Sequence, residues 1–180
     1  MLRKIMSGGQ TGVDRAALDA AILLDIEYGG WCPKGRLDEH GTIPTKYKNL
    51  EEIAGEFKTE KENYDARTRA NIKGSKGTLI IVPKLSFPEK IKDGTKLTIE
   101  EAQRLKKPNL IVNLSNPIHV NAQLIVDWIE KNEISILNIG GPRESTCPGI
   151  YQASFKLLEA ALFQCVNSLK IGPFNVVAKL

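Results

Sequence analysis

The sequence has few of the residues that build disulfide or zinc sites. Its three cysteines, Cys32, Cys147 and Cys165, are an odd number, and no two of them have CxxC spacing. This pattern argues against a disulfide framework and indicates a reducing compartment. There are only two histidines, His40 and His119, and neither completes an HExxH motif or a Ser-His-Asp order. The residues therefore give no sign of a zinc enzyme or a serine hydrolase.

Long apolar runs and long basic runs are also missing. No apolar stretch approaches the roughly 18 residues of a membrane span, and the start MLRKIMSGGQ becomes glycine-rich too early for a signal peptide. We therefore expect a cytoplasmic protein with no membrane partner. The formal charge is +4, from 25 Lys and Arg against 21 Asp and Glu, but the two signs are interspersed. No basic run interleaves with aromatics, so nucleic acid is not supported as a partner.

Short apolar runs alternate with helical patterns along the whole chain, which predicts an α/β class with parallel strands and helices on both faces. The clearest strand is TLIIV, residues 78–82. A chain of 180 residues is long enough to bury one core. We expect one domain over residues 1–170 and a tail over 171–180. Further strands are predicted at 5–7, at a short run ending at 31–32, at 110–114 and at 134–139, and helices at 11–24, 50–57, 65–73, 98–105, 120–131 and 149–169.

Two glycine-rich loops after predicted strands are the strongest candidates for a binding site. They are GGQTGVDR, residues 8–15, and GGPRESTCPGIY, residues 140–151. The carboxyl ends of parallel strands meet at one edge of a sheet, so we expect both loops to border one hollow there. Small residues at a helix N-terminus let backbone N–H groups approach a phosphate. A structural alternative for the first loop is a capping box in which Thr11 is the N-cap and Asp14 is its partner.

The segment GGWCPKGR, residues 29–36, adds cationic candidates. It places Lys34 and Arg36 beside the thiol of Cys32. A guanidinium next to an ammonium attracts phosphate or carboxylate. The alternative is a solvated basic turn with an inert cysteine.

Two helical segments add further candidates. Arg67 and Asn71 are four residues apart and share a helix face, whereas Arg69 points elsewhere. The turn Asp93-Gly94-Thr95, with Thr98 beyond it, either faces a phosphate or lets Thr95 or Thr98 cap the next helix.

The candidate ligand-binding residues are therefore Gly8, Gly9, Gln10, Thr11, Gly12, Asp14, Arg15, Cys32, Lys34, Arg36, Arg67, Asn71, Gly94, Thr95, Thr98, Gly140, Gly141, Arg143, Glu144 and Ser145. No catalytic residue is assigned. Cys32 and Cys147 both precede a proline on candidate loops and are the thiols that could touch a metal, but two cysteines without a histidine are a poor metal set.

Several motifs in one order resemble the molybdenum-cofactor carrier family, which is related to the lysine-decarboxylase-like phosphoribohydrolases and DNA-processing protein A. The motifs are SGGQTGVDRAALDAA, GWCPKGR, RTRAN, GTLII, DGTKLTIEEA and IGGPRESTCPGIY, within residues 3–165. The resemblance implies a three-layer α/β/α Rossmann-like fold with a mostly parallel open sheet. It also implies a phosphorylated pterin or nucleotide-like ligand, with the molybdenum cofactor (molybdopterin) as the expected one, and a homo-oligomer, dimer or tetramer.

One departure separates the chain from the phosphoribohydrolases. Arg67 matches the arginine with which those enzymes act, but Thr98 stands where their PGGxGTxxE motif has its glutamate. A threonine cannot replace a carboxylate acid or base, although Glu100 or Glu144 could supply one from elsewhere. We therefore favour a binding or carrier protein. The alternatives are a nucleotide N-glycosidic hydrolase and a nucleotide-sensing regulatory protein.

Overall fold

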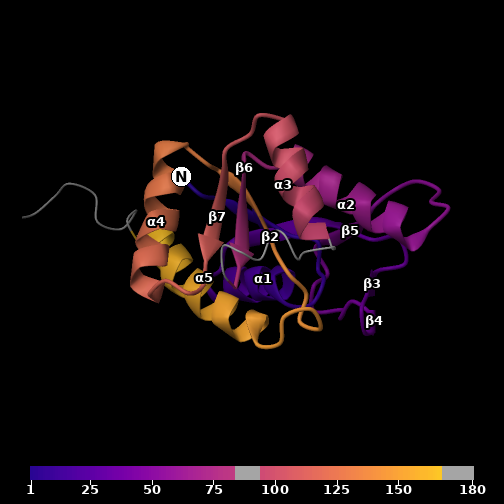
Figure 1. Ribbon diagram of the computed structural model, residues 1–180, viewed down its shortest axis with the longest axis horizontal. Helices are drawn as coiled ribbons and strands as arrows, with labels where there is room; N and C mark the ends of the chain where they lie inside the picture. The colour runs from indigo at the N-terminus through magenta and orange to yellow at the C-terminus, as the bar shows by residue number, and fades with distance from the viewer. Residues whose placement is uncertain (84–93, 168–180) are drawn as a thin grey trace, which may run out of the picture.

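The computed structural model describes residues 1–83 and 94–167 and shows a parallel sheet between two layers of helices (Figure 1). Its six strands run in the order β5-β2-β1-β8-β6-β7, and each neighbouring pair is parallel. The strands are β1 Lys4–Met6, β2 Glu27–Cys32, β5 Leu50–Glu52, β6 Gly77–Val82, β7 Asn109–Asn113 and β8 Ile136–Gly140. A small antiparallel hairpin pairs β3 Leu37–Asp38 with β4 Gly41–Thr42. The predicted three-layer, Rossmann-like α/β fold is thus confirmed.

The helices divide between the two faces of the sheet. They are α1 Val13–Leu23, α2 Glu60–Gly74, α3 Gly94–Arg104, α4 Ile118–Lys131 and α5 Ile150–Asn167. Helix α5 packs between α1 and α4 on one face, while α2 and α3 pack together on the other (Figure 1). This arrangement leaves the loops at the carboxyl ends of β1 and β8 between the two layers.

The main core lies between the sheet and helices α1, α4 and α5. Strand β6 is buried along its whole length, so that Leu79 and Ile81 face this core while Ile80 and Val82 pack beneath α3. Such burial on both faces explains why a continuous β-branched run could be recognised as a strand from sequence. Among the described residues, no helix combines the length and the apolar character that crossing a membrane requires.

Two predicted features of local structure are wrong. Residues 50–57 do not form a helix: Leu50–Glu52 is the edge strand β5, which pairs with Gly30–Cys32 of β2, and Gly55 beyond it has a φ of 138°. The N-cap of α1 is Gly12, at a φ of 73°, and no side chain caps that helix. The Thr11–Asp14 capping box is therefore absent.

The start of α3 also differs from the prediction. Helix α3 begins at Gly94, so Thr95 and Thr98 lie inside it and neither is its cap. Asp93, the end of the last predicted helix and the proposed tail over 171–180 lie outside the described residues.

Candidate functional site

A cavity of about 1130 Å³ opens at the carboxyl edge of the sheet, between the start of α1, helix α2 and the first turn of α3. Gln10 and Asp14 of the first glycine-rich loop and helix line it together with Gly140, Gly141 and Arg143 of the last loop. The prediction that these two loops share one hollow is confirmed. Ligand pockets commonly occupy about 300–1,000 Å³, so the cavity has room for a ligand of nucleotide size.

The two loops touch directly where α1 begins. The backbone N–H of Val13 donates to the carbonyl of Pro142 at 3.2 Å, and the N–H of Glu144 donates to Thr11 Oγ1 at 3.1 Å. A Cβ on Gly12 would overlap the Pro142 carbonyl oxygen. The last loop thus supplies a hydrogen-bond acceptor for a backbone N–H at the start of α1. The two loops face the cavity on the side toward α2.

Arg67 and Asp14 form a buried ion pair in the cavity wall. Their atoms Nη1 and Oδ2 are 3.1 Å apart, and the two side chains are 15% and 4% exposed. Helix α2 carries Arg67 across Gly8, where any Cβ would overlap the guanidinium. The carboxylate next to Arg67 is therefore that of Asp14 on α1, rather than Glu100 or Glu144.

Burial affects both members of this pair. Burial raises the pKa of Asp14 above its usual range, even though Arg67 and Arg15 both favour its charged form. Within the described part of the chain, the buried Nε of Arg67 has no hydrogen-bond partner. A guanidinium has five N–H donors in a planar fork, and the 15% of the Arg67 side chain that is exposed lies in the cavity lining, where it can meet the oxygens of an anion.

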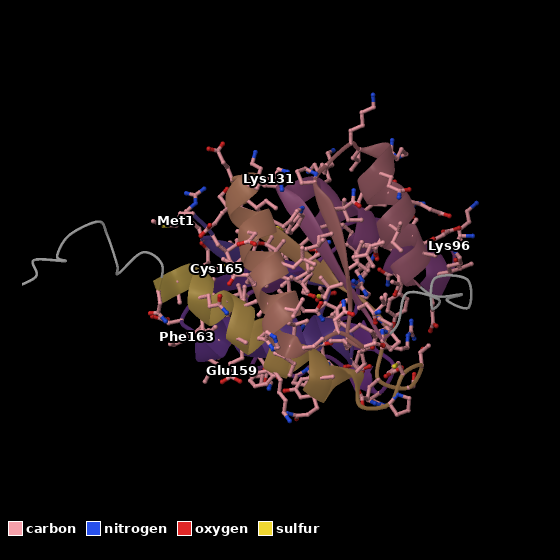
Figure 2. All side chains as sticks on the ribbon, turned by 60° about the vertical axis from the view of Figure 1, so that its left-hand side comes forward. Met1, Lys96, Lys131, Glu159, Phe163 and Cys165 are labelled. Carbon is pink, nitrogen blue, oxygen red and sulfur yellow. The ribbon has the colours of Figure 1, made fainter. Side chains whose placement is uncertain are left out.

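Further cations and one aromatic ring lie around the Arg67 side of the cavity. Arg69 lines the cavity as well, so the expectation that it points elsewhere is wrong. Lys61 and Lys96 stand at the rim, and Lys96 projects from α3 on the opposite side of the molecule from Phe163 (Figure 2). The guanidinium of Arg143 lies 6.0 Å from the ring centre of Tyr64.

Sequence reasoning missed Tyr64, although a signal was present. Tyr64 is three residues before Arg67 and four before Thr68, and residues at those spacings share a helix face. Tyr64, Arg67 and Thr68 all line the cavity. Extending the Arg67–Asn71 face by one turn toward the helix start would have included the ring.

Asn71 and Thr98 reach the cavity but already have partners in the protein. The Asn71 amide accepts from the backbone N–H of Trp31 and donates to its carbonyl, each at 2.8 Å. Thr98 Oγ1 donates to the carbonyl of Gly94 at 2.8 Å. Asn71 thus fixes β2 against α2. The other α3 residues in the cavity lining are Gly94, Thr95, Lys96, Leu97, Ile99 and Glu100.

The 29–36 segment does not reach the cavity. Lys34 Nζ donates to the carbonyl of Gly55 at 3.0 Å, and Arg36 donates to the carbonyls of Leu50 and Tyr47 at 2.9 and 3.1 Å. Cys32 is fully buried in a cluster with Leu50. Cys32 therefore fits the inert cysteine of the alternative, whereas Lys34 and Arg36 bind backbone carbonyls instead of being only solvated.

The thiols do not form a metal centre in the described part of the chain. All three cysteines are free, and the described residues contain no group of three His, Cys, Asp or Glu side chains arranged around a common point. Burial raises the pKa of the Cys32 thiol and that of the Cys147 thiol. Both are therefore weak thiolate donors at neutral pH.

Glu39, which the sequence did not suggest, joins the two glycine-rich loops. It lies in the turn of the β3–β4 hairpin, and its carboxylate accepts hydrogen bonds from the hydroxyls of Thr11 and Ser145. Burial alone would raise the pKa of Glu39, but these hydrogen bonds and the charge of Arg143 hold it below its usual range. The remaining loop candidates lie outside the cavity: Gly9 sits against Ile43 and Leu50, while Thr11, Gly12, Arg15 and Glu144 border a second hollow of about 480 Å³.

Comparisons with known proteins agree with this architecture. Residues 5–162 match the model of the circularly permutated YpsA SLOG family. The chain belongs to this family. A search of curated proteins finds no match. The structure is similar to that of a protein from Syntrophus aciditrophicus SB named "Putative molybdenum carrier protein", with 45% sequence identity and a TM-score of 0.80 over 89% of this chain and 95% of that one. The resemblance to the molybdenum carrier family is thereby confirmed.

Proposed function

We propose that this protein is a molybdenum-cofactor carrier that binds a phosphorylated pterin, or its nucleotide form, in the cavity at the carboxyl edge of the sheet. The similar protein from Syntrophus aciditrophicus supports the molybdenum part of this proposal through its name. The observation that carries the binding part is Arg67, a buried guanidinium whose Nε has no partner among the described residues.

The arginines of the cavity suit such a cargo. Arg67, Arg69 and Arg143 lie on its wall, whereas the rim lysines Lys61 and Lys96 are paired with Asp65 and Glu100. The other acidic lining residues are Glu60 and Asp14, and Asp14 is paired with Arg67. Planar guanidinium groups bind phosphate oxygens in pairs. The phosphate would therefore face Arg67, and the flat ring system would extend toward Tyr64 and the first turn of α3.

The hydrolase alternative is not favoured. Asp14 is the carboxyl group beside Arg67, but it is buried and held in an ion pair, and Thr98 donates its hydroxyl within its own helix. A general acid must reach the bond that it protonates. Glu100 also lines the cavity, but it is exposed and paired with Lys96 on its own helix. Neither Asp14 nor Thr98, the two positions beside the matched arginine and at the glutamate position, is thus a free carboxylic acid.

The proposal is tested by identifying what the protein carries after gentle anaerobic purification. We expect mass spectrometry to find a phosphorylated pterin, with molybdenum in stoichiometric amount by elemental analysis. Arg67→Ala should reduce the retained pterin at least about tenfold, because a lost hydrogen bond to a charged group costs about 1.5–3 kcal/mol. The exposed Arg3 supplies a matched control, and Arg3→Ala should retain the pterin.

A second variant reaches the same guanidinium indirectly. Gly8→Ala should displace Arg67, because the new Cβ would overlap it, and should reduce retention in the same way. If the effect passes through Arg67, the double variant should be no worse than Arg67→Ala alone. A bound nucleotide without molybdenum, or release of a free base from a nucleotide panel, would refute the carrier proposal.

A further inference from the structure

The turn of the β3–β4 hairpin inserts a carboxylate between the two glycine-rich loops. Glu39 is contacted there by four donors: the Ser145 backbone N–H at 3.2 Å, the hydroxyls of Ser145 and Thr11, and Arg143, whose Nε lies 3.9 Å away. The Glu39 side chain is 8% exposed. The carboxylate is therefore surrounded by donors from both loops rather than by solvent.

This set of donors is chemically a binding position for an oxyanion. Backbone N–H groups, hydroxyls and guanidinium groups are the donors with which proteins hold phosphate oxygens. A carboxylate and a phosphate both present acceptor oxygens with negative charge, so the same donors serve either. His40 adds an imidazole nitrogen 3.9 Å from the Glu39 carboxylate.

The donors around the Glu39 carboxylate can be reached from solvent, and Glu39 itself lies on a short hairpin. Ser145 is exposed. The hairpin strands β3 and β4 have two residues each. Other contacts hold the hairpin in place: Asp38 pairs with Arg15, and the backbone N–H of Glu39 donates to Gln10 Oε1 at 3.0 Å. The Glu39 side chain can therefore leave its donors while the hairpin backbone stays where it is.

We propose that Thr11, Ser145 and Arg143 form a second anion-binding position, which takes an oxyanion such as a phosphate group, and that Glu39 is its intramolecular occupant. An incoming phosphate competes with Glu39 for these donors. The position does not include Arg67, and Thr11 and Ser145 are not part of the cavity lining, whereas Arg143 borders both the position and the cavity. The inference rests on the proposed function only in that the same two loops border both positions.

The test uses inorganic phosphate with the full chain and needs no cofactor. Replacing the carboxylate in Glu39→Ala opens the position, and we expect at least about tenfold tighter phosphate binding than in the wild type by calorimetry. Thermal unfolding should show the same gain, because a ligand of the folded state raises stability with its concentration. Sulfate should act like phosphate, whereas chloride at equal ionic strength should not.

Control variants separate this position from the Arg67 cavity. Glu56 is exposed, and Glu56→Ala should bind phosphate like the wild type. Adding Ser145→Ala to Glu39→Ala should remove the gain, whereas adding Arg67→Ala should leave it intact. Loss of the gain with Arg67→Ala would locate the phosphate in the cavity and overturn the proposal.

The isosteric variant keeps the proposal testable if Glu39→Ala does not fold. Glu39→Gln retains the side-chain volume and should also bind phosphate more tightly than the wild type. A folded Glu39→Ala or Glu39→Gln without any gain would overturn the second position. That outcome would not affect the carrier proposal, because the carrier proposal is tested separately by measuring the pterin that the purified protein retains.

Discussion

Asp14 combines two opposing effects within one side chain. Its burial disfavours the carboxylate, whereas Arg67 at 3.1 Å favours it. Burial is the larger effect, so the pKa of Asp14 lies above its ordinary value. Removing Arg67 would leave this carboxyl group without its charged partner. The ion pair therefore serves the arrangement of the cavity more than the stability of the fold.

The raised pKa of Asp14 predicts a pH dependence of stability. The folded chain holds this proton more tightly than the unfolded chain, so the stabilisation is fully present below the ordinary pKa of 3.8 and is lost as the pH rises through the folded value. Asp14→Asn cannot titrate. Its free energy of unfolding should therefore rise relative to that of the wild type as the pH increases above about 4.

Urea unfolding of both proteins at several pH values within this range measures the difference. Glu56→Asn, at an exposed carboxylate, is the matched control and should show little change. A difference between Asp14→Asn and the wild type that stays constant, or moves in the other direction, would contradict the assignment of a raised pKa.

At the scale of elements, the segment after β2 is held by Arg36. Its guanidinium donates to the backbone carbonyls of Leu50 and Tyr47, which positions the edge strand β5 and the residues before it. Arg36 is half-buried. Removing its guanidinium would leave the two carbonyls without their charged donor, and water would only partly replace it, so the protein would lose stability. Arg36 is thus a structural cation.

Arg36→Ala should destabilise the protein without weakening retention of the pterin. We expect the free energy of unfolding to fall by about 1–3 kcal/mol, since two such bonds are lost from a partly exposed side chain. Urea unfolding measures the fall, and Lys34→Ala, which removes one bond from an exposed side chain, is the milder control. Loss of the pterin with stability unchanged would restore the interpretation of Arg36 as a ligand-binding residue.

The elements that the sequence predicted well are those with strong local patterns. Strand β6 is a continuous apolar run, and helices α1, α4 and α5 each carry an apolar face, so they appear within a few residues of their predicted bounds. Strand β5 was missed because its conformation depends on pairing with β2, some twenty residues earlier in the chain. A short segment with no local preference takes the structure that its neighbour imposes.

The candidate site was predictable in part for the same reason. Topology alone brings the ends of β1 and β8 together, so the meeting of the two glycine-rich loops followed from the α/β pattern. The role of Glu39 did not, because its partners Thr11 and Ser145 are 28 and 106 residues away. No spacing rule connects such positions before the fold is known.

At the scale of the whole molecule, the outer face of α5 carries an exposed apolar side chain. Phe163 is 56% exposed and projects outward near Glu159 (Figure 2). Helix α4, which packs against α5, exposes Val120 and Leu124. Exposed apolar surface can mark an association site. We predict that the expected dimer or tetramer uses the Phe163 end of α5, on the opposite side of the molecule from Lys96 at the cavity rim (Figure 2).

Sedimentation velocity tests that expectation. The wild type should sediment as a species larger than the 19.9 kDa chain, and Phe163→Asp should shift it toward the monomer while leaving the fold intact, because the side chain is already exposed. Glu159→Gln is the control on the same helix and should not change the size. A monomeric wild type would contradict the predicted oligomer.

The position of β8 between β1 and β6 also constrains how the protein is made. The loop that closes the start of α1 is Pro142–Glu144, more than 120 residues further along the chain. While the ribosome is still synthesising the first two thirds of the chain, β1 and β6 have no strand to join them. A nascent chain therefore cannot form this cavity until β8 and the loop over residues 140–145 have left the exit tunnel.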